Sequence, residues 1–200
     1  IDFKSAVTLT GSVLFDTNVG GGFVHFDNTL DGTVSGAQDL TLRAGTGNVF
    51  FDKAVGAGTR LGAILVNSAN YWTISKSITA ASIRQVAGGQ DTWFHGAVNT
   101  NTAAGIDLNG TNFYFTNAPV TATSGGGVSI TNSGTVLISS NSDMNLDGAF
   151  LQDGTGSVQT GGDITTTGDA ITFTGPVDLS ANSRLNTTAG PGAGNVSFLN

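Results

Sequence analysis

Short runs of alternating apolar and polar residues recur along the whole chain. In a typical run an apolar residue, a variable residue and an aromatic or aliphatic residue precede a polar corner and further apolar residues. This period of two is typical of β-strands that bury one face and expose the other. The runs that show the pattern are Ile1–Phe3 with Val7–Leu9, Val24–Phe26 with Leu30, Val49–Phe51 with Val55, Thr92–Phe94 with Val98, Phe113–Phe115 with Val120, and Ile171–Phe173 with Val177–Leu179.

The spacing of these runs predicts how the strands are arranged. They begin at residues 1, 24, 49, 92, 113, 136, 171 and 196, separated by roughly one or two multiples of 21 to 25 residues. That is the length of one coil of a parallel β-solenoid, whose coils stack about 4.8 Å apart to enclose a core. We therefore predict an all-β parallel β-helix, or solenoid. Its candidates for an internal aromatic stack are Phe3, Phe26, Phe51, Phe94, Phe115, Phe173 and Phe198.

Other structures remain open at this stage. Short strands with turns roughly every 8 to 12 residues also describe β-sandwiches, so tandem β-sandwich modules of about 100 residues are the alternative fold. The recurrence near 23 residues is finer than such modules require, and Trp72 and Trp93 have no Cys pair beside them. Residues 75–90 fit the repeat least, and we expect there a coil with an irregular edge or a short helical excursion.

A glycine turn precedes several of the predicted strands. It reads Gly-x-Gly, one small or variable residue and then Val, as in residues 45–49, 154–158 and 192–196. Glycine adopts a positive φ at a tight corner, which a residue with a Cβ resists. The alternative, a phosphate-binding loop, requires a helix directly after the turn, and no helix is predicted there. We therefore interpret these turns as corners between strands.

The end of the chain repeats its beginning. Residues 171–179 align with residues 1–9, and residues 194–198 align with residues 22–26 after a two-residue insertion. A chain that starts and stops inside the same unit is expected to be a slice of something longer. We predict one continuous repeat segment over residues 1–200, with a unit of about 170 residues whose next copy starts at residue 171.

Composition narrows the classes of function. The chain has 30 Gly, 14 Asp with no Glu, only 7 Lys and Arg together, no Cys and a net charge of −7. Without Cys, neither disulfides nor thiolate metal sites can form. No basic patch exists to bind nucleic acid or an anionic membrane, and no run of about 18 apolar residues predicts membrane insertion. If the protein is exported, we expect its signal upstream of Ile1.

Four residues are the main candidates for chemistry. Asp143 and Asp147 suggest a carboxylate pair for polysaccharide cleavage, but four strand positions span about 13 Å, too far for either glycosidase mechanism. Turn aspartates could also bind Ca²⁺, although the Gly-Gly-x-Gly-x-Asp repeat typical of such sites is missing. His25 and His95 should both point outward, with no Cys or second ligand spaced to help. We therefore predict no catalytic residue, no metal ligand and no cofactor.

Three strings resemble the very large exported β-strand-repeat proteins of bacteria. They read VTLTG at residues 7–11, LTLRAGTGNVFF at residues 40–51 and ITFTGPVDL at residues 171–179. They are similar to sequences of filamentous haemagglutinin-type adhesins and autotransporter passengers, and the resemblance covers nearly the whole chain. It implies a right-handed β-helix in a long secreted or surface fibre, and it implies no catalytic residue.

Together these observations predict a structural and adhesive segment of an extracellular bacterial fibre. It would be a stiff rod whose many weak contacts add up through effective concentration. The expected partners are further copies or repeats joined end to end, and host or matrix polysaccharides or other cell-surface ligands. One alternative is a self-assembling filament subunit joined to neighbouring copies. The other is a β-helix enzyme that cleaves polysaccharides, which the scarcity of basic residues disfavours, so we expect no enzymatic activity.

Overall fold

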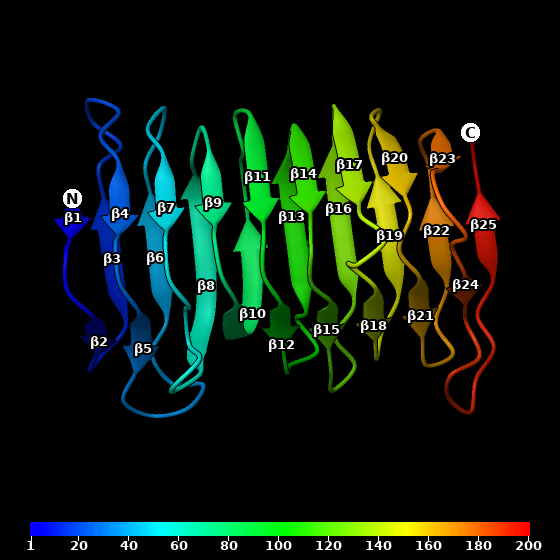
Figure 1. Cartoon of the computed structure of the whole chain (residues 1–200), viewed down its shortest axis with the longest axis horizontal. Helices are drawn as coiled ribbons and strands as arrows, with labels where there is room; N and C mark the ends of the chain where they lie inside the picture. The colour runs from blue at the N-terminus through cyan, green and yellow to red at the C-terminus, as the bar shows by residue number, and fades with distance from the viewer.

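Parallel strands stack in successive coils along the whole chain. The computed structural model describes residues 1–200 and contains 25 β-strands and no helix, hence no helix that could cross a membrane. Every strand pairing is parallel. Figure 1 shows the strands side by side along the long axis, with the two termini at opposite ends. The predicted parallel β-solenoid is confirmed, and the alternative of β-sandwich modules, which are antiparallel, is wrong.

One strand of each coil belongs to a nine-stranded sheet, which we call the first face. Equivalent positions in neighbouring strands, beginning with Phe3, Phe26 and Phe51, lie 19 to 25 residues apart. The predicted coil length therefore agrees closely with the structure. The strands of this face are β1 (Asp2–Phe3), β4 (Val24–Phe26), β7 (Val49–Phe51), β9 (Trp72–Ile74), β11 (Asp91–Phe94), β14 (Asn112–Phe115), β17 (Thr135–Ile138), β20 (Ser157–Thr160) and β23 (Val177–Leu179).

The remaining strands of each coil form a second and a third face. The second face contains β2 (Val7–Leu9), β5 (Leu30–Gly32), β12 (Val98–Thr100), β15 (Val120–Ala122), β18 (Met144–Leu146), β21 (Ile164–Thr166) and β24 (Leu185–Asn186). The third face contains β3 (Val13–Asp16), β6 (Leu40–Arg43), β8 (Leu61–Ser68), β13 (Ile106–Gly110), β16 (Val128–Asn132), β19 (Phe150–Asp153), β22 (Ile171–Phe173) and β25 (Val196–Phe198).

The stretch 75–90 contains a long strand instead of a helix. In β10 (Ile78–Gln85), residues 78–80 pair with β12 on the second face, whereas residues 83–85 pair with β13 on the third face. The same strand pairs with β8 in the preceding coil. The expected helical excursion is wrong, because β10 has a hydrogen-bonded neighbour on both sides and continues around what is a corner in later coils.

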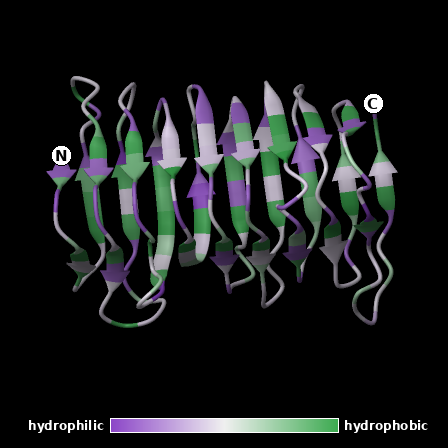
Figure 2. Ribbon diagram, viewed as in Figure 1, coloured by the Kyte–Doolittle hydropathy of each residue, from purple (hydrophilic) through white to green (hydrophobic).

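Apolar side chains of all three faces meet in one core of 38 buried hydrophobic residues. Figure 2 shows hydrophobic positions in every part of the stack, alternating with hydrophilic positions along the strands. Because the chain has no cysteine and therefore no disulfide, burial of this apolar surface and pairing of the backbone stabilise the fold.

The predicted aromatic stack is present, but it is interrupted. Neighbouring rings on the first face stack with centroids 4.8 to 5.2 Å apart in two separate groups, Phe3 with Phe26 and Phe51, and Phe94 with Phe115. Ile74 occupies the equivalent position in the coil between the two groups. An aliphatic side chain fills the core there but cannot continue the stack of rings.

Phe173 and Phe198 belong to a different face from the one expected. They lie in β22 and β25 on the third face, where their rings stack 5.3 Å apart. Phe173 is fully buried, whereas Phe198 is 50% exposed. Residues 171–173 therefore occupy a different step of the coil from residues 1–3, although both stretches read Ile-x-Phe. Both stretches alternate in the same way, because each face of the solenoid imposes the same inward and outward periodicity.

The glycine turns are corners, as predicted, and no helix follows them. Gly45 has a φ of +61°, where glycine is favoured because it lacks a Cβ. Gly47 has a different reason: a Cβ built there would lie 2.0 Å from the carbonyl oxygen of Gly22 in the preceding coil. The second glycine of this turn thus permits close stacking of two coils.

Candidate functional site on the first face

The solvent side of the first face carries a row of aromatic and histidine side chains. In β11, Thr92 and Phe94 are buried, so the alternate residue Trp93 points outward. The register places Trp93 between Thr73 of β9 and Tyr114 of β14. The set that we call the aromatic row consists of Phe23, His25, Phe50, Trp93, His95 and Tyr114.

Trp93 and Tyr114 form a tight stacked pair in this row. Their ring centroids are 3.9 Å apart and their planes differ by 13°. His95 stacks on Trp93 with centroids 5.3 Å apart. Partial burial raises the pKa of Tyr114 above its ordinary value, and the nearby Asp91 carboxylate acts in the same direction. The Tyr114 hydroxyl therefore remains a hydrogen-bond donor at neutral pH.

Polar pairs flank the stacked rings on both sides. On one side Asn112 Nδ2 donates to Asp91 Oδ1 over 2.9 Å. On the other side His95 Nδ1 lies 2.9 Å from Thr116 Oγ1. Each pair connects two neighbouring coils and so holds its members in place. Aromatic surface bordered by carboxylate, amide and hydroxyl groups can bind a ligand that has both apolar patches and hydroxyl groups.

Two hollows open beside the aromatic row. One, of about 260 Å³, is lined by Thr73, Trp93 and His95. It arises because the small Thr73 side chain separates Phe50 from Trp93 along the row. The other, of about 320 Å³, is lined by Phe23, His25, Phe50 and Asp52. Both hollows lie on the solvent side of the sheet, where a ligand could reach them.

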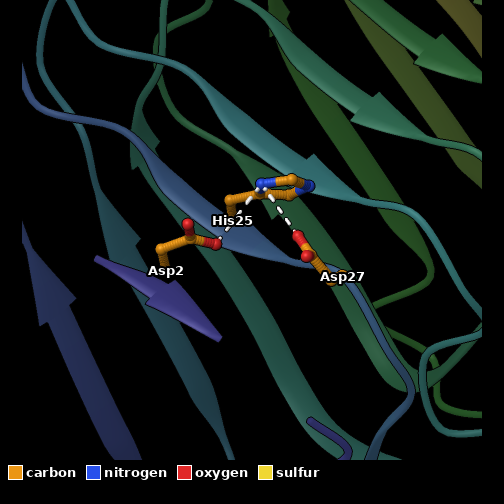
Figure 3. A group of neighbouring side chains, drawn as sticks. All are labelled: Asp2, His25 and Asp27. Carbon is orange, nitrogen blue, oxygen red and sulfur yellow. Dashed lines mark ion pairs between the residues drawn. The ribbon is translucent and has the colours of Figure 1, made fainter. Parts of the chain in front are cut away.

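His25 lies among three carboxylates at the N-terminal part of the same face. Its Nδ1 atom is 3.5 Å from Asp2 Oδ1 and 3.1 Å from Asp27 Oδ1, as Figure 3 shows. Its Nε2 atom is 3.1 Å from Asp52 Oδ2. We call Asp2, His25, Asp27 and Asp52 the His25 cluster. Its members come from three successive coils, because Asp2 is in β1, His25 is in β4 and Asp52 follows β7.

Lys4 neutralises part of this negative charge. Its Nζ atom lies 2.9 Å from both Asp2 Oδ2 and Asp27 Oδ2. The hydrogen bond from Lys4 lowers the pKa of Asp27 below its ordinary value, and the interactions with Asp27 and Asp2 raise the pKa of Lys4. Lys4 thus holds the outer oxygens of both carboxylates, while their Oδ1 atoms face His25.

The structure places His25 and His95 on the solvent side of the first face, as predicted. They lie in different coils and in different surroundings, so they do not form a joint site. The expectation that no further ligand type lies near them is wrong for His25, which three carboxylates surround. A signal was present in the sequence: aligning Phe3, Phe26 and Phe51 also aligns Asp2 with His25, and Asp27 with Asp52.

Asp143 and Asp147 do not form a pair. Asp143 precedes β18 and accepts a hydrogen bond from the Asp163 backbone N–H. Asp147 follows β18 and accepts hydrogen bonds from the Gly125 N–H and the Thr167 hydroxyl, which lower its pKa. Both carboxylates therefore brace neighbouring coils. One group of three residues with potential metal-binding side chains lies close together, and it consists of Asp2, His25 and Asp27. Asp143 and Asp147 do not belong to it.

A further hollow, larger than the two beside the aromatic row, has no ionisable side chain in its lining. It has a volume of about 420 Å³ and lies along strand ends and the adjoining turns of successive coils. Its lining consists of Ala87, Gly88, Asn109, Gly110, Thr111, Thr131, Asn132, Ser133, Gly154 and Thr155. Amides, hydroxyls and backbone groups can form hydrogen bonds there, but none of these side chains is suited to act as a general acid or base.

Comparisons with protein-family models, with curated proteins and with solved structures gave no match.

Proposed function

We propose that the chain is a stiff adhesive segment of a long extracellular bacterial fibre, and that the aromatic row contacts polysaccharides. The observation that carries this proposal is the Trp93–Tyr114 stack on a solvent-facing surface, with hydrogen-bonded polar pairs on both sides. Sugar rings have apolar C–H faces that pack on aromatic side chains, and hydroxyl groups that need hydrogen-bond partners.

The shape of the fold supports a role that depends on length and stiffness. Successive coils are joined by parallel backbone pairing and share one continuous core. Each further coil lengthens such a rod by about 4.8 Å without changing its cross-section. Sites repeated along a rod can engage one polymer together, so modest individual affinities give firm attachment.

The exposed edges of the terminal coils favour partners that stack end to end with this chain. Strands β1 and β25 each have a paired neighbour on one side only, and Ile1, Val196 and Phe198 are 40 to 50% exposed. Unpaired strand edges and apolar surface favour the addition of a further coil. In an adhesive rod that coil belongs to the same chain. In the alternative, a filament subunit, it belongs to a neighbouring copy.

Electrostatics indicate which polysaccharides to test. Asp2, Asp27, Asp52 and Asp91 lie beside the aromatic row, and the chain has a net charge of −7. Sulfated or uronic-acid polymers would meet like charge there, whereas neutral or amino-sugar polymers would not. We therefore expect binding to neutral and amino-sugar polysaccharides in preference to anionic ones.

The test is retention of the protein on insoluble neutral and amino-sugar polysaccharides, compared for the unmodified chain, Trp93→Ala and Tyr114→Ala. Loss of one stacking ring should weaken binding by about 0.5 to 1.5 kcal/mol, up to about tenfold. The matched control is Leu14→Ala, which removes a 50% exposed apolar side chain from the third face. Equal retention of the unmodified chain and a Trp93→Ala/Tyr114→Ala double variant would contradict the proposal.

A further inference from the structure

We propose that Asp2, His25 and Asp27 bind one divalent cation of the zinc type, with Asp52 as the residue that orients the histidine. The three ligand atoms are Asp2 Oδ1, His25 Nδ1 and Asp27 Oδ1, and all of them lie within 4.8 Å of one another. The inference concerns the His25 cluster and does not depend on polysaccharide binding.

The hydrogen bond to Asp52 decides which nitrogen of His25 is free. An ionised carboxylate only accepts hydrogen bonds. Both ring nitrogens lie 3.1 Å from a carboxylate oxygen, but only the contact between Nε2 and Asp52 Oδ2 has hydrogen-bond geometry, whereas Asp27 Oδ1 beside Nδ1 has no hydrogen-bond partner. This geometry places the proton of a neutral imidazole on Nε2. The lone pair of Nδ1 then points towards the oxygens of Asp2 and Asp27. Metal-binding histidines usually donate their second N–H to a carboxylate in this way.

The arrangement around Nδ1 calls for a positive charge. When Nδ1 carries no proton, its lone pair lies 3.1 Å from Asp27 Oδ1 and 3.5 Å from Asp2 Oδ1, which is repulsive unless a cation lies among them. Asp27 Oδ1 is itself buried and makes no hydrogen bond. Buried polar atoms without a partner are rare, because losing water without replacing its hydrogen bond is costly. A bound cation would satisfy this oxygen.

The separations match a small tetrahedral ion. Zinc bonds of about 2.0 to 2.2 Å place adjacent ligand atoms of a tetrahedron about 3.3 to 3.6 Å apart. The two nitrogen-to-oxygen separations of 3.1 and 3.5 Å need only small adjustments of the side chains, and the two oxygens lie within 4.8 Å of one another. One nitrogen and two oxygens leave a fourth position for water. Calcium is a poorer fit, because it prefers six to eight oxygen ligands at about 2.3 to 2.6 Å.

Lys4 does not occupy the same position. Its ammonium group contacts the Oδ2 atoms of Asp2 and Asp27, whereas the proposed ligand atoms are their Oδ1 atoms. With a neutral His25, the three carboxylates and one ammonium group leave two excess negative charges, which a divalent cation balances. Lys4 also fixes the orientation of both carboxylates, so the site is partly assembled before the cation binds.

The test is calorimetric titration of the metal-free chain with Zn²⁺ in a buffer that does not bind zinc. We expect one Zn²⁺ per chain, loss of that isotherm in His25→Ala and in Asp27→Asn, and affinity lowered about 10- to 100-fold in Asp52→Ala. His95→Ala is the matched control, because it removes the other outward-facing histidine of the first face, and it should bind Zn²⁺ unchanged. Ca²⁺ should bind the unmodified chain far more weakly.

Nitrogen NMR of the histidine rings tests the site without a substitution. Zn²⁺ should shift the Nδ1 resonance of His25 and leave His95 unchanged. The proposal is overturned if the unmodified chain gives no one-to-one isotherm, or if the isotherm survives in His25→Ala. It is also overturned if Nδ1 of His25 carries a proton and does not respond to Zn²⁺. None of these results bears on the adhesive function.

Discussion

Gln152 donates a hydrogen bond from Nε2 to Asn132 Oδ1 over 2.8 Å between two successive coils, inside the mostly apolar interior. Gln152 is fully buried and Asn132 is 2% exposed. The side-chain oxygen of Gln152, Oε1, accepts hydrogen bonds from the backbone N–H groups of Thr174 and Gly175. One side chain thus satisfies polar groups at a corner between the third and the first face.

Replacement of this side chain should be costly. Gln152→Leu leaves the Gly175 N–H and Asn132 Oδ1 without partners in the core, and we expect unfolding free energy to fall by about 2 to 4 kcal/mol. The control is Gln159→Leu on the solvent side of β20, which should change the unfolding free energy by no more than about 0.5 kcal/mol. Urea denaturation measures the unfolding free energy of both variants. Equal losses in Gln152→Leu and Gln159→Leu would contradict a stabilising role for the buried hydrogen bonds of Gln152.

A methyl group at Gly47, the second glycine of the turn at residues 45–49, should disrupt the stacking of two coils. In Gly47→Ala the new Cβ would lie 2.0 Å from the Gly22 carbonyl oxygen, so we expect a loss of about 1 to 3 kcal/mol in unfolding free energy. Gly11→Ala is the matched control, because nothing lies within 4 Å of the corresponding Cβ. Thermal unfolding should show Gly11→Ala unchanged or slightly more stable. If Gly47→Ala left the unfolding free energy unchanged, the coils would not be packed this closely at Gly47.

The hydrogen bonds to Asp147 should make part of the stability depend on pH. Its pKa is lowered in the folded chain by the Gly125 N–H and the Thr167 hydroxyl. Its contribution is therefore fully present above the unfolded pKa of about 3.9 and is lost as pH falls through the lower, folded pKa. We expect Asp147→Asn to lower the melting temperature at pH 7 and to have a smaller effect in strong acid. The control is Asp153→Asn, because Asp153 is exposed. If Asp147→Asn lowered the melting temperature equally at all pH values, the proposed contribution of the ionised Asp147 carboxylate to stability would be contradicted.

The prediction that the chain is not an enzyme can be tested directly. We expect no new reducing ends and no unsaturated products when the protein is incubated with neutral or acidic polysaccharides. The carboxylates of Asp2 and Asp27 are held by His25 and Lys4, and the hollow of about 420 Å³ is lined by uncharged side chains. Chromatography and a reducing-sugar assay measure the outcome. Cleavage that disappears in Asp52→Asn would show that the His25 cluster is catalytic.

Sequence periodicity alone was sufficient to predict the architecture. The alternation in Thr92–Phe94 places Phe94 in the core and His95 outside, and the structure has both. The coil length follows from the recurrence of such runs, because a coil buries its apolar residues only when the next coil covers them. Inward and outward positions, coil length and glycine corners are local properties, so they can be derived without knowledge of contacts.

Tertiary structure decided which coils and faces come together. Residues 171–173 share the Ile-x-Phe pattern of residues 1–3 yet lie on the third face, because alternation specifies inside and outside but not the corner from which a strand starts. The His25 cluster depends on register in the same way. Asp2, His25 and Asp52 meet only because the first two coils advance by 23 and 25 residues between aligned positions. A change of one residue in either spacing would turn a carboxylate to the opposite side of the sheet, since side chains alternate at every step.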